Sequence, residues 1–535
     1  MKKSRDEKHG LKTFEIYDII DGQQRITTVL ILLRGIISQL ENLGDGSAEE
    51  LAKLKEDYLK YKNIYKLELL GEDNGFFRSY VIDSTDYPDA TLTPSQRRLK
   101  EAKYFFREKL AEIKNSDPSK FGEVLIQFLD KIGSLEIIRY PVENDADAAR
   151  IFETVNDRGK QLTNLEKTKS FLMQMVYLTV PEETEDATPY LRQINESFSR
   201  IFRDFEDIRN TEKGEKLSED DIQRYHFVVY EADAKGDVKI SYRYLEFLKK
   251  KIRNIYRVNK QQCLKYVLDY TKDLESSFSA LKEIITYKES DELGSLLDKI
   301  YILGVVANFY PLLIASVIRF KKEREKLREI LKIIEIFSFK VYGIGRKRSD
   351  TGISSIYPLA YKVHCENLGY EDIRRELIDN INYYQDDKDF KINLAVENFY
   401  DRVYNADIKY LLFEYEKFLR MKAKEPLVDI NFDDILSEKF EVEHIWARDP
   451  TKLKLSKKLL EIHEQYRDKL GNLTLASKSW NSKWGNNPFA DKKKEYKDSN
   501  LRVQRELAGI PKWDKEYIEE REHQIISFVM ERWKI

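Results

Sequence analysis

The residues best suited to chemistry gather in a short stretch near the C-terminal end of the 535-residue chain. The stretch contains adjacent acidic and imidazole side chains, two carboxamides and a lysine, namely Glu443, His444, Asn472, Asn481 and Lys483. Hydrolysis of a phosphodiester with one metal ion needs a base that deprotonates water and a hard divalent cation that holds the phosphate. Magnesium takes oxygen ligands and often only one or two from the protein. The stretch therefore predicts a one-metal nuclease centre.

Each of these side chains suits a separate role. The Glu443 carboxylate and the Asn481 carboxamide can bind Mg2+ or Mn2+, and the His444 imidazole can accept a proton from water. Asn472 can hold the turn that orients the histidine, and Lys483 can neutralise phosphate charge. The alternative is a surface Glu–His pair followed by ordinary turn chemistry after a glycine.

The distribution of charge favours a nucleic acid at this stretch. The whole chain carries 92 Lys and Arg against 94 Asp and Glu, so it has no global positive field. Residues 446–500 carry 11 Lys and 2 Arg against 7 Asp and Glu, together with Trp446, Trp480 and Trp484. A local basic surface with aromatic side chains is suited to phosphate and base contacts.

The elements that must position these residues can be predicted from periodicity. Residues 440–446 alternate like a strand, residues 455–470 have the period of a helix, and residues 472–476 form a second strand. A short helix can begin at Trp480. The order strand, long excursion, strand and helix brings both strand ends and one helix face together.

A second candidate site lies near the N-terminus. Residues 14–20 are predicted to form a short strand, and residues 26–37 a buried helix that is apolar almost all round. The backbone N–H groups at the helix start attract anions, phosphate above all, and an arginine there can add a bidentate contact. The alternative is a tight turn whose arginine pairs with a core carboxylate, and the spacing alone does not decide between them. The turn consists of Asp21, Gly22, Gln23, Gln24 and Arg25.

A third stretch, residues 148–166, is predicted to be a helix, a glycine stop and a new helix opened by a capping box of Thr163 and Glu166. A helix–turn–helix joint explains most of this pattern. Asn156 and Arg158, beside the glycine, can also face a ligand held by the Arg25 turn.

The rest of the chain is predicted to be mainly helical. Helices are expected at residues 45–66, 93–114 and 119–132, a strand at 135–142, and nearly continuous helix from 190 to 425. A chain of this length is expected to contain about three or four domains. We expect an N-terminal domain at 1–180, a helical domain at 190–425 and a C-terminal domain at 426–535.

No membrane segment is expected, and the cytoplasm is the default location. The N-terminus has no apolar h-region, and Cys263 and Cys365 form no CxxC pair. Residues 300–318 carry no charge, but they contain Pro311 and are predicted to be a buried helix pair broken near that proline.

Three motifs carry a family resemblance. Residues 443–445, residues 471–475, and Asn481 with Lys483 resemble the His-Asn-Asn variant of the HNH (ββα-metal) nucleases, and more narrowly the C-terminal domain of GmrSD-type (type IV, modification-dependent) restriction enzymes. Residues 21–28 resemble the DGQQR box of the N-terminal domain of that family, which has a ParB/sulfiredoxin-like fold. Residues 152–162 resemble a second box of the same domain.

The resemblance implies a mainly α chain with small α+β parts: a ParB/sulfiredoxin-like N-terminal domain, a large helical middle and a C-terminal ββα-metal HNH domain. It implies His444 as general base, Glu443 and Asn481 near the metal, and Asn472 as the structural asparagine. It also implies that the Asp21–Arg25 turn binds or hydrolyses an NTP, or senses modified DNA. Only 20 residues precede Asp21, without the proline-led Tyr-Gln-Arg box of the family. Two interpretations follow, a truncated N-terminal fold or an internal start, and both leave NTP hydrolysis an open question.

The leading hypothesis is a Mg2+-dependent endonuclease or nickase that acts on modified or foreign double-stranded DNA in phage defence and is gated by the N-terminal domain. Members of the family recognise glucosylated hydroxymethylcytosine DNA or, in SspE-like relatives, phosphorothioate DNA. The alternatives are a non-catalytic DNA or nucleotide sensor and an NTPase whose nuclease domain only docks. The sequence leaves oligomerisation open.

Overall fold

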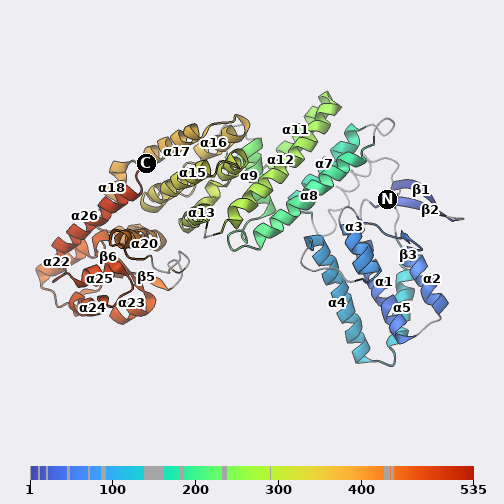
Figure 1. Ribbon diagram of the computed structural model, residues 1–535, viewed down its shortest axis with the longest axis horizontal. Helices are drawn as coiled ribbons and strands as arrows, with labels where there is room; N and C mark the ends of the chain where they lie inside the picture. Colours follow the sequence, from blue (N-terminus) through green and yellow to red (C-terminus); the bar gives the residue numbers. More distant parts are fainter. Residues whose placement is uncertain are drawn as a thin grey trace. The chain divides into compact units, whose positions relative to one another are not determined.

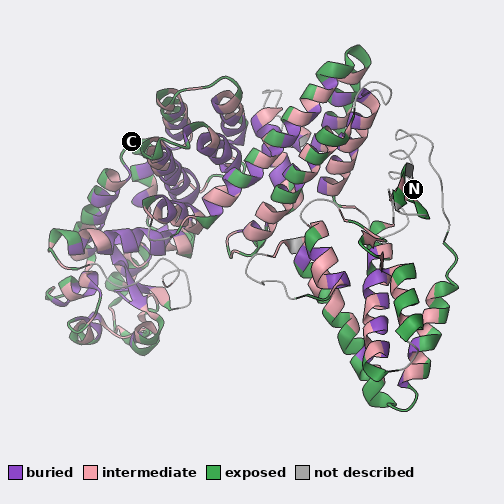
Figure 2. Ribbon diagram, turned by 45° about the vertical axis from the view of Figure 1, so that its right-hand side comes forward, coloured by how far each residue is buried: buried purple, intermediate pink, exposed green. Residues whose placement is uncertain are grey.

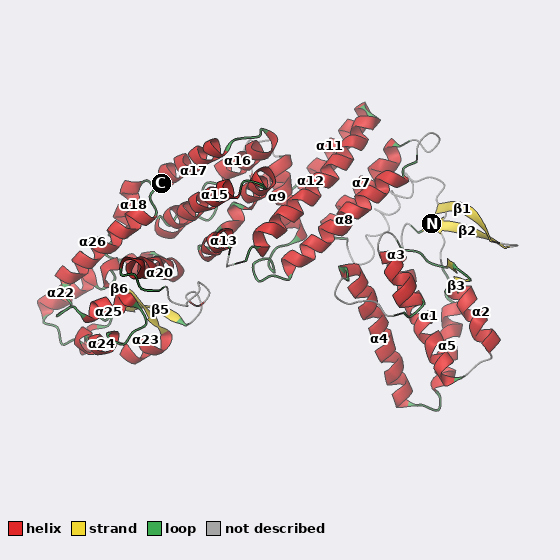
Figure 3. Ribbon diagram, viewed as in Figure 1, coloured by secondary structure: helices red, strands yellow, loops and turns green. Residues whose placement is uncertain are grey.

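The structure is a computed structural model, and it is mainly helical, as predicted (Figures 1 and 3). Within the residues it describes, the strands form three separate two-stranded sheets. The described residues are 2–9, 12–19, 22–44, 48–69, 73–85, 92–137, 162–180, 186–231, 238–288, 291–426, 434 and 439–535.

The chain divides into two compact units, and each is described by itself. The predicted division into three domains stays a prediction. Unit 1 comprises Met1–Asn210, Leu217–Gln223 and Arg243–Ser279, and unit 2 comprises Thr211–Lys216, Arg224–Tyr242 and Ala280–Ile535.

Unit 1 is built around α1, which contacts α2, α4 and α5 (Figure 1). The buried side of α1 joins two hydrophobic clusters, one with Leu33 against Phe77 and one with Ile36 against Leu110 and Phe121. The elements are β1 (Lys2–His9), β2 (Lys12–Asp18), α1 (Gln23–Leu43), α2 (Ala48–Tyr58), β3 (Lys60–Tyr61), β4 (Ile64–Tyr65), α3 (Asp73–Phe76), the π-helix η1 (Phe77–Ile82), α4 (Pro94–Ser116), α5 (Phe121–Gly133), α7 (Asn164–Thr179), α8 (Thr188–Arg209) and α11 (Tyr244–Val258).

The predicted helix starts in unit 1 are confirmed by their caps. At α4, the Thr93 hydroxyl accepts a hydrogen bond from the Gln96 N–H at 3.2 Å, with Pro94 in the first turn. At α7, the Thr163 hydroxyl accepts from the Glu166 N–H at 3.2 Å, and the Glu166 carboxylate accepts from the Thr163 N–H at 2.9 Å. Each cap satisfies N–H groups that have no partner inside the helix.

The predicted helix over residues 45–66 is wrong in its second half. α2 ends at Tyr58, and a small antiparallel hairpin of β3 and β4 follows. Asp83 holds both strands, because its carboxylate pairs with Lys60 and accepts a hydrogen bond from the Tyr65 hydroxyl at 2.5 Å. The predicted strand at 135–142 is not seen in residues 135–137, and its remainder lies outside the described residues.

The apolar stretch 300–318 forms a broken helix pair in unit 2, as predicted. α13 ends at Ile302 and α14 begins at Tyr310, with Pro311 in its first turn. Among the described helices, α1 alone is long and apolar enough by length and composition to cross a membrane. The same α1 carries the packed core of unit 1, which is the usual setting of such a helix in a globular fold.

Unit 2 has a core that mixes helices and strands (Figure 2). Ile408 of α20, Leu475 of β6 and Val529 of α26 belong to one buried cluster. Glu416 of α20 also accepts hydrogen bonds from the backbone N–H groups of Arg502, at 2.7 Å, and Val503, at 2.8 Å. The segment before residue 426 and the segment after residue 439 are therefore parts of one packed body.

The elements of unit 2 are mostly helices. α9 (Glu219–Tyr230) and α12 (Lys260–Thr286) contribute residues to both units. The others are α10 (Val238–Ser241), α13 (Glu292–Ile302), η4 (Val306–Asn308), α14 (Tyr310–Phe320), α15 (Arg324–Phe337), the π-helix η5 (Ser338–Ile344), α16 (Ile353–Cys365), α17 (Tyr370–Tyr384), α18 (Asp387–Leu394), α19 (Phe399–Arg402), α20 (Asn405–Lys422), β5 (Phe440–His444), η6 (Pro450–Lys452), α22 (Lys457–Tyr466), η7 (Leu470–Asn472), β6 (Leu473–Ser477), α23 (Lys478–Trp484), α24 (Phe489–Tyr496), α25 (Arg502–Ala508) and α26 (Lys515–Arg532).

Candidate active site

The predicted strand, excursion, strand and helix are present at the C-terminal stretch. β5 pairs antiparallel with β6, with His444 opposite Leu473, and α23 follows β6 directly. α22 lies in the excursion between the strands, within the range predicted for a helix. The last residue of β5 is thus His444, at the point where the strand pair ends.

His444 is buried and has a carboxylate partner. Its Nε2 atom lies 3.2 Å from Oδ1 of Asp468, and its ring meets the ring of Tyr400 edge-on at 4.5 Å between centroids. Burial lowers the pKa of His444 below its usual 6.5, although the Asp468 charge opposes the shift. The imidazole is therefore neutral near pH 7, the state in which it can accept a proton.

Asp468 is held in place from several sides. Its carboxylate accepts from Nε of Arg448 at 2.9 Å and from Nε of Arg467 at 3.1 Å, and its backbone carbonyl accepts from the Tyr400 N–H at 3.0 Å. Burial would raise the pKa of Asp468, but the hydrogen bond to His444 and the Arg448 charge bring it down to about 2. Asp468 is therefore an ionised acceptor that fixes the imidazole ring.

Glu443 occupies a different environment from the adjacent His444. Its carboxylate forms a buried ion pair with Lys492 of α24, and the same ammonium donates to the His444 carbonyl at 2.9 Å. Burial raises the pKa of Glu443 and lowers the pKa of Lys492, and each charge opposes the shift in the other. Since successive strand residues point to opposite faces, Glu443 shares its face with Glu441.

Asn481 lies against that face. Its Nδ2 atom donates to Oε2 of Glu441 at 2.5 Å, so the helix α23 reaches β5 two positions before Glu443. Lys483, on the same helix, pairs with Glu495 at 2.8 Å and is largely exposed. The structure thus brings Asn481 to the strand that carries Glu443 and His444, and it places Lys483 in a surface ion pair.

Asn472 is completely buried and all its contacts are made with the surrounding protein. Its Oδ1 atom accepts from the Trp446 N–H at 2.7 Å and from Trp513 Nε1 at 2.9 Å. Its Nδ2 atom donates to the carbonyls of Trp446, at 2.9 Å, and Arg467, at 2.7 Å. These four hydrogen bonds hold the segment that leaves β5 against the segment that enters β6. Asn472 therefore has a structural role.

The preceding Gly471 allows the close approach of α26. A Cβ atom at this position would lie 2.2 Å from the backbone oxygen of Ile518. Arg521 of α26, which is buried, donates from one guanidinium nitrogen to the carbonyls of Gly471, at 2.7 Å, and Leu473, at 2.8 Å. Helix α26 therefore fixes the start of β6.

The donor chemistry of the site fits a hard divalent cation. Two carboxylates and one carboxamide, those of Glu441, Glu443 and Asn481, lie along one face of β5 and α23 and offer only oxygen ligands to a metal. Among the described residues, no group of three His, Cys, Asp or Glu side chains is arranged to hold a metal ion. A cation here would therefore use few protein ligands, as Mg2+ commonly does.

The N-terminal turn has the predicted strand–glycine–helix order. Gly22 has a left-handed backbone, with φ of 88°, and caps α1, whose first turn contains no acidic residue. Gln23, Gln24 and Arg25 are exposed, and the Gln23 side chain donates to the Ile19 carbonyl at 2.6 Å. The remaining predicted ligands, Asp21, Asn156 and Arg158, lie outside the described residues, so a ligand site at this turn stays a prediction.

Two partners of the site have no short-range signal in the sequence. Asp468 lies 24 residues from His444, and Lys492 lies 49 residues from Glu443. The opposite faces of Glu443 and His444 also follow from the strand alternation that the sequence shows.

Two family models match the chain. The model of the GmrSD restriction endonuclease N-terminal domain matches residues 7–173, and the model of the GmrSD restriction endonucleases C-terminal domain matches residues 384–528. The second range contains the whole β5–β6–α23 site, and the first contains the glycine turn before α1. No curated protein matches the chain.

Proposed function

Because the chain belongs to the GmrSD family of restriction endonucleases, we propose that it is a divalent-metal-dependent nuclease of the HNH type that cuts or nicks modified double-stranded DNA. The observation that carries this proposal is the neutral, buried His444 oriented by Asp468 at the end of β5, beside α23 and its Asn481.

The proposed base is His444. The hydrogen bond from Nε2–H to Asp468 leaves Nδ1 as the nitrogen that accepts a proton. In this tautomer His444 deprotonates the water that attacks the phosphodiester, and the ionised Asp468 stabilises the imidazolium that forms. Tyr400, packed edge-on, restricts rotation of the ring.

The proposed metal ligands are Asn481 with Glu443 or Glu441. A bound Mg2+ or Mn2+ supplies Lewis-acid stabilisation of the charge on the phosphate oxygens. Lys492 pairs with Glu443, and a cation would compete with its ammonium for that carboxylate. Asn472 has a positioning role in this scheme, since it clamps the ends of both strands. Lys483 is proposed to contact the phosphate backbone next to the site.

The proposed gate is the turn before α1. An exposed helix N-terminus without acidic residues, with Arg25 in its first turn, is suited to a phosphate of an NTP or of DNA. We propose that occupancy of this turn, and sensing of the DNA modification by the N-terminal segment, control cleavage by unit 2.

A second candidate function is a non-catalytic DNA sensor. The observation that favours it is the pairing of Glu443 with a buried lysine, which leaves fewer acidic ligands for a cation. In that case unit 2 would bind DNA through the basic segment 446–500 without hydrolysing it.

The test is a plasmid-nicking assay with plain, glucosylated and phosphorothioate DNA, in Mg2+, Mn2+ or EDTA, with and without NTP. Wild-type protein is expected to cut at least one modified substrate in the presence of metal, and His444→Ala is expected to lose this activity. His523→Ala is the matched control, because this histidine of α26 is exposed and lies outside the site. Salt-sensitive DNA binding without cleavage would support the sensor, and equal cleavage by His444→Ala would refute the assignment of the base.

A further inference from the structure

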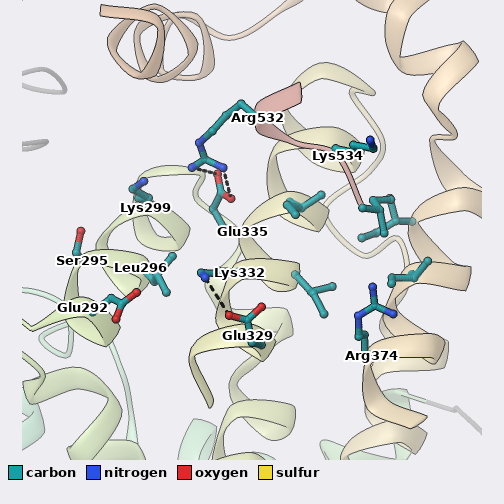
Figure 4. A pocket seen from close by; sticks show the side chains of 15 residues that line it. Glu292, Ser295, Leu296, Lys299, Glu329, Lys332, Glu335, Arg374, Arg532 and Lys534 are labelled. Atoms are coloured by element: carbon teal, nitrogen blue, oxygen red, sulfur yellow. Dashed lines mark hydrogen bonds and ion pairs between the residues drawn. The ribbon is translucent and has the colours of Figure 1, made fainter. Parts of the chain in front are cut away.

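Unit 2 contains a hollow that the nuclease chemistry does not use. Its volume is about 550 Å3, within the range of small-molecule sites, and it is enclosed by α13, α15, α17 and the end of α26 (Figure 4). Its apolar lining comes from three helices: Leu296 of α13, Ile333 and Ile336 of α15, and Ile378 and Ile381 of α17. These side chains can contact an apolar group of a ligand.

The carboxylates that line the hollow each have a basic neighbour. Glu335 pairs with Arg532 at 3.4 Å, and Glu329 pairs with Lys332 at 2.9 Å. Glu292 pairs at 3.4 Å with Arg328, which lies outside the hollow and also pairs with Glu329.

Two cationic side chains in the lining differ from these pairs. Arg374 of α17 and Lys534, after α26, form no ion pair with any carboxylate in the part of the chain that the structure describes. Figure 4 shows both on the same side of the hollow, across from Glu292 and Lys299 of α13. Lys299 is already engaged by Glu414, at 3.2 Å. The surplus positive charge thus lies at one side of the hollow, together with the isoleucines of α17.

We propose that this hollow binds an organic phosphate of nucleotide size. The guanidinium of Arg374 can hold a phosphate through two parallel hydrogen bonds, and Lys534 can add a point charge beside it. The apolar lining of the hollow contacts the apolar or planar part of the ligand. The site is separate from the glycine turn before α1 and does not depend on the nuclease mechanism.

The test is calorimetric titration of the full chain with ADP and with GDP, with adenosine and inorganic phosphate as the two halves of the ligand. A nucleotide is expected to bind saturably at this hollow, separately from any binding at the turn before α1, and the halves are expected to bind at least about tenfold more weakly. Arg374→Gln and Lys534→Gln are each expected to weaken nucleotide binding about tenfold or more, since each removes a charged contact to phosphate. The matched control is Arg375→Gln, because the adjacent Arg375 is exposed and its charge is already paired with Asp372.

Arg25→Ala separates this site from the N-terminal turn. Nucleotide binding that persists in Arg25→Ala and weakens in Arg374→Gln supports the proposal. The proposal is overturned if neither nucleotide binds, if the double variant Arg374→Gln/Lys534→Gln binds as tightly as wild type, or if Arg25→Ala alone abolishes binding. Inorganic phosphate that binds as tightly as ADP would also overturn it, because the apolar lining would then contribute nothing to the binding.

Discussion

Nε2 of His444 lies 3.2 Å from Oδ1 of Asp468, and two arginines hold the same carboxylate from its other sides. A histidine fixed through one nitrogen presents the other in a defined direction. The relationship links α22, which ends just before Asp468, to the end of β5. Cleavage should therefore depend on a residue that takes no part in bond making.

Asp468→Asn is expected to lower kcat for DNA cleavage by between about tenfold and a hundredfold, because the ring loses its fixed tautomer and the charge that stabilises imidazolium. KM for DNA should change little, since Asp468 is buried and makes no contact that a substrate could replace. Steady-state kinetics on a modified plasmid check this. Asp401→Asn is the control, as exposed Asp401 pairs with Arg448 but not with His444; an equal loss in that variant would contradict the prediction.

Lys492→Met is expected to destabilise the protein by about 3–5 kcal/mol, because it leaves the Glu443 carboxylate buried without its partner. The double variant Lys492→Met/Glu443→Gln should recover much of this loss, since it removes the uncompensated charge. Urea unfolding of the wild type, both single variants and the double variant measures the coupling. Additive effects of the two substitutions would show that the pair contributes no coupling energy.

Gly471→Ala is expected to destabilise unit 2 by at least about 3 kcal/mol, because the added methyl group would meet the backbone oxygen of Ile518, which no side-chain rotation can relieve. Thermal unfolding followed by tryptophan fluorescence can report the change. Gly369→Ala, where the nearest atom is a carboxylate oxygen of Asp372 at 3.6 Å, should lie close to wild type. Similar melting temperatures for the two variants would count against the packing of α26 on this turn.

The stability of unit 2 is expected to fall as the pH drops below 6.5. Burial lowers the pKa of His226 from 6.5 in the unfolded chain to about 3 in the folded chain. Between these two pH values the unfolded chain binds a proton at His226 and the folded chain does not. The resulting loss in the free energy of unfolding is absent above pH 6.5 and reaches about 2 kcal/mol at pH 5. His226→Phe should flatten this part of the profile in urea unfolding at several pH values, and exposed His523→Gln should leave it in place. An unchanged slope in His226→Phe would exclude His226 as its source.

The order of elements around the site could be predicted because each has a local signature. The alternation of residues 440–446 and the capping box of Thr163 and Glu166 depend on neighbours a few positions apart, and both elements are found where expected. The helix predicted over residues 59–65 is wrong because the conformation of these residues depends on Asp83. Asp83 binds both strands of the hairpin and lies outside the predicted helix.

The site itself was predictable only in its residue types. Adjacent acid and imidazole groups indicated a nuclease, but adjacency in a strand separates their side chains onto two faces. Their partners, Asp468 and Lys492, are set by how α22 and α24 pack on the strand pair, which no short-range pattern encodes. Asn472 is the exception, since a buried asparagine between a glycine and a strand already suggests a clamp.

The segments before residue 426 and after residue 439 share one core, and this limits how the nuclease domain can be transferred between genes. Glu416 of α20 binds the backbone of Arg502 and Val503, and β6 packs with α20 and α26 in one cluster. A gene fusion that carried only residues 426–535 would leave that buried carboxylate and half of a hydrophobic core behind. The same cluster includes Leu303 and Phe339, so even a break at residue 384, where the C-terminal family match begins, would divide the core that supports the strand pair.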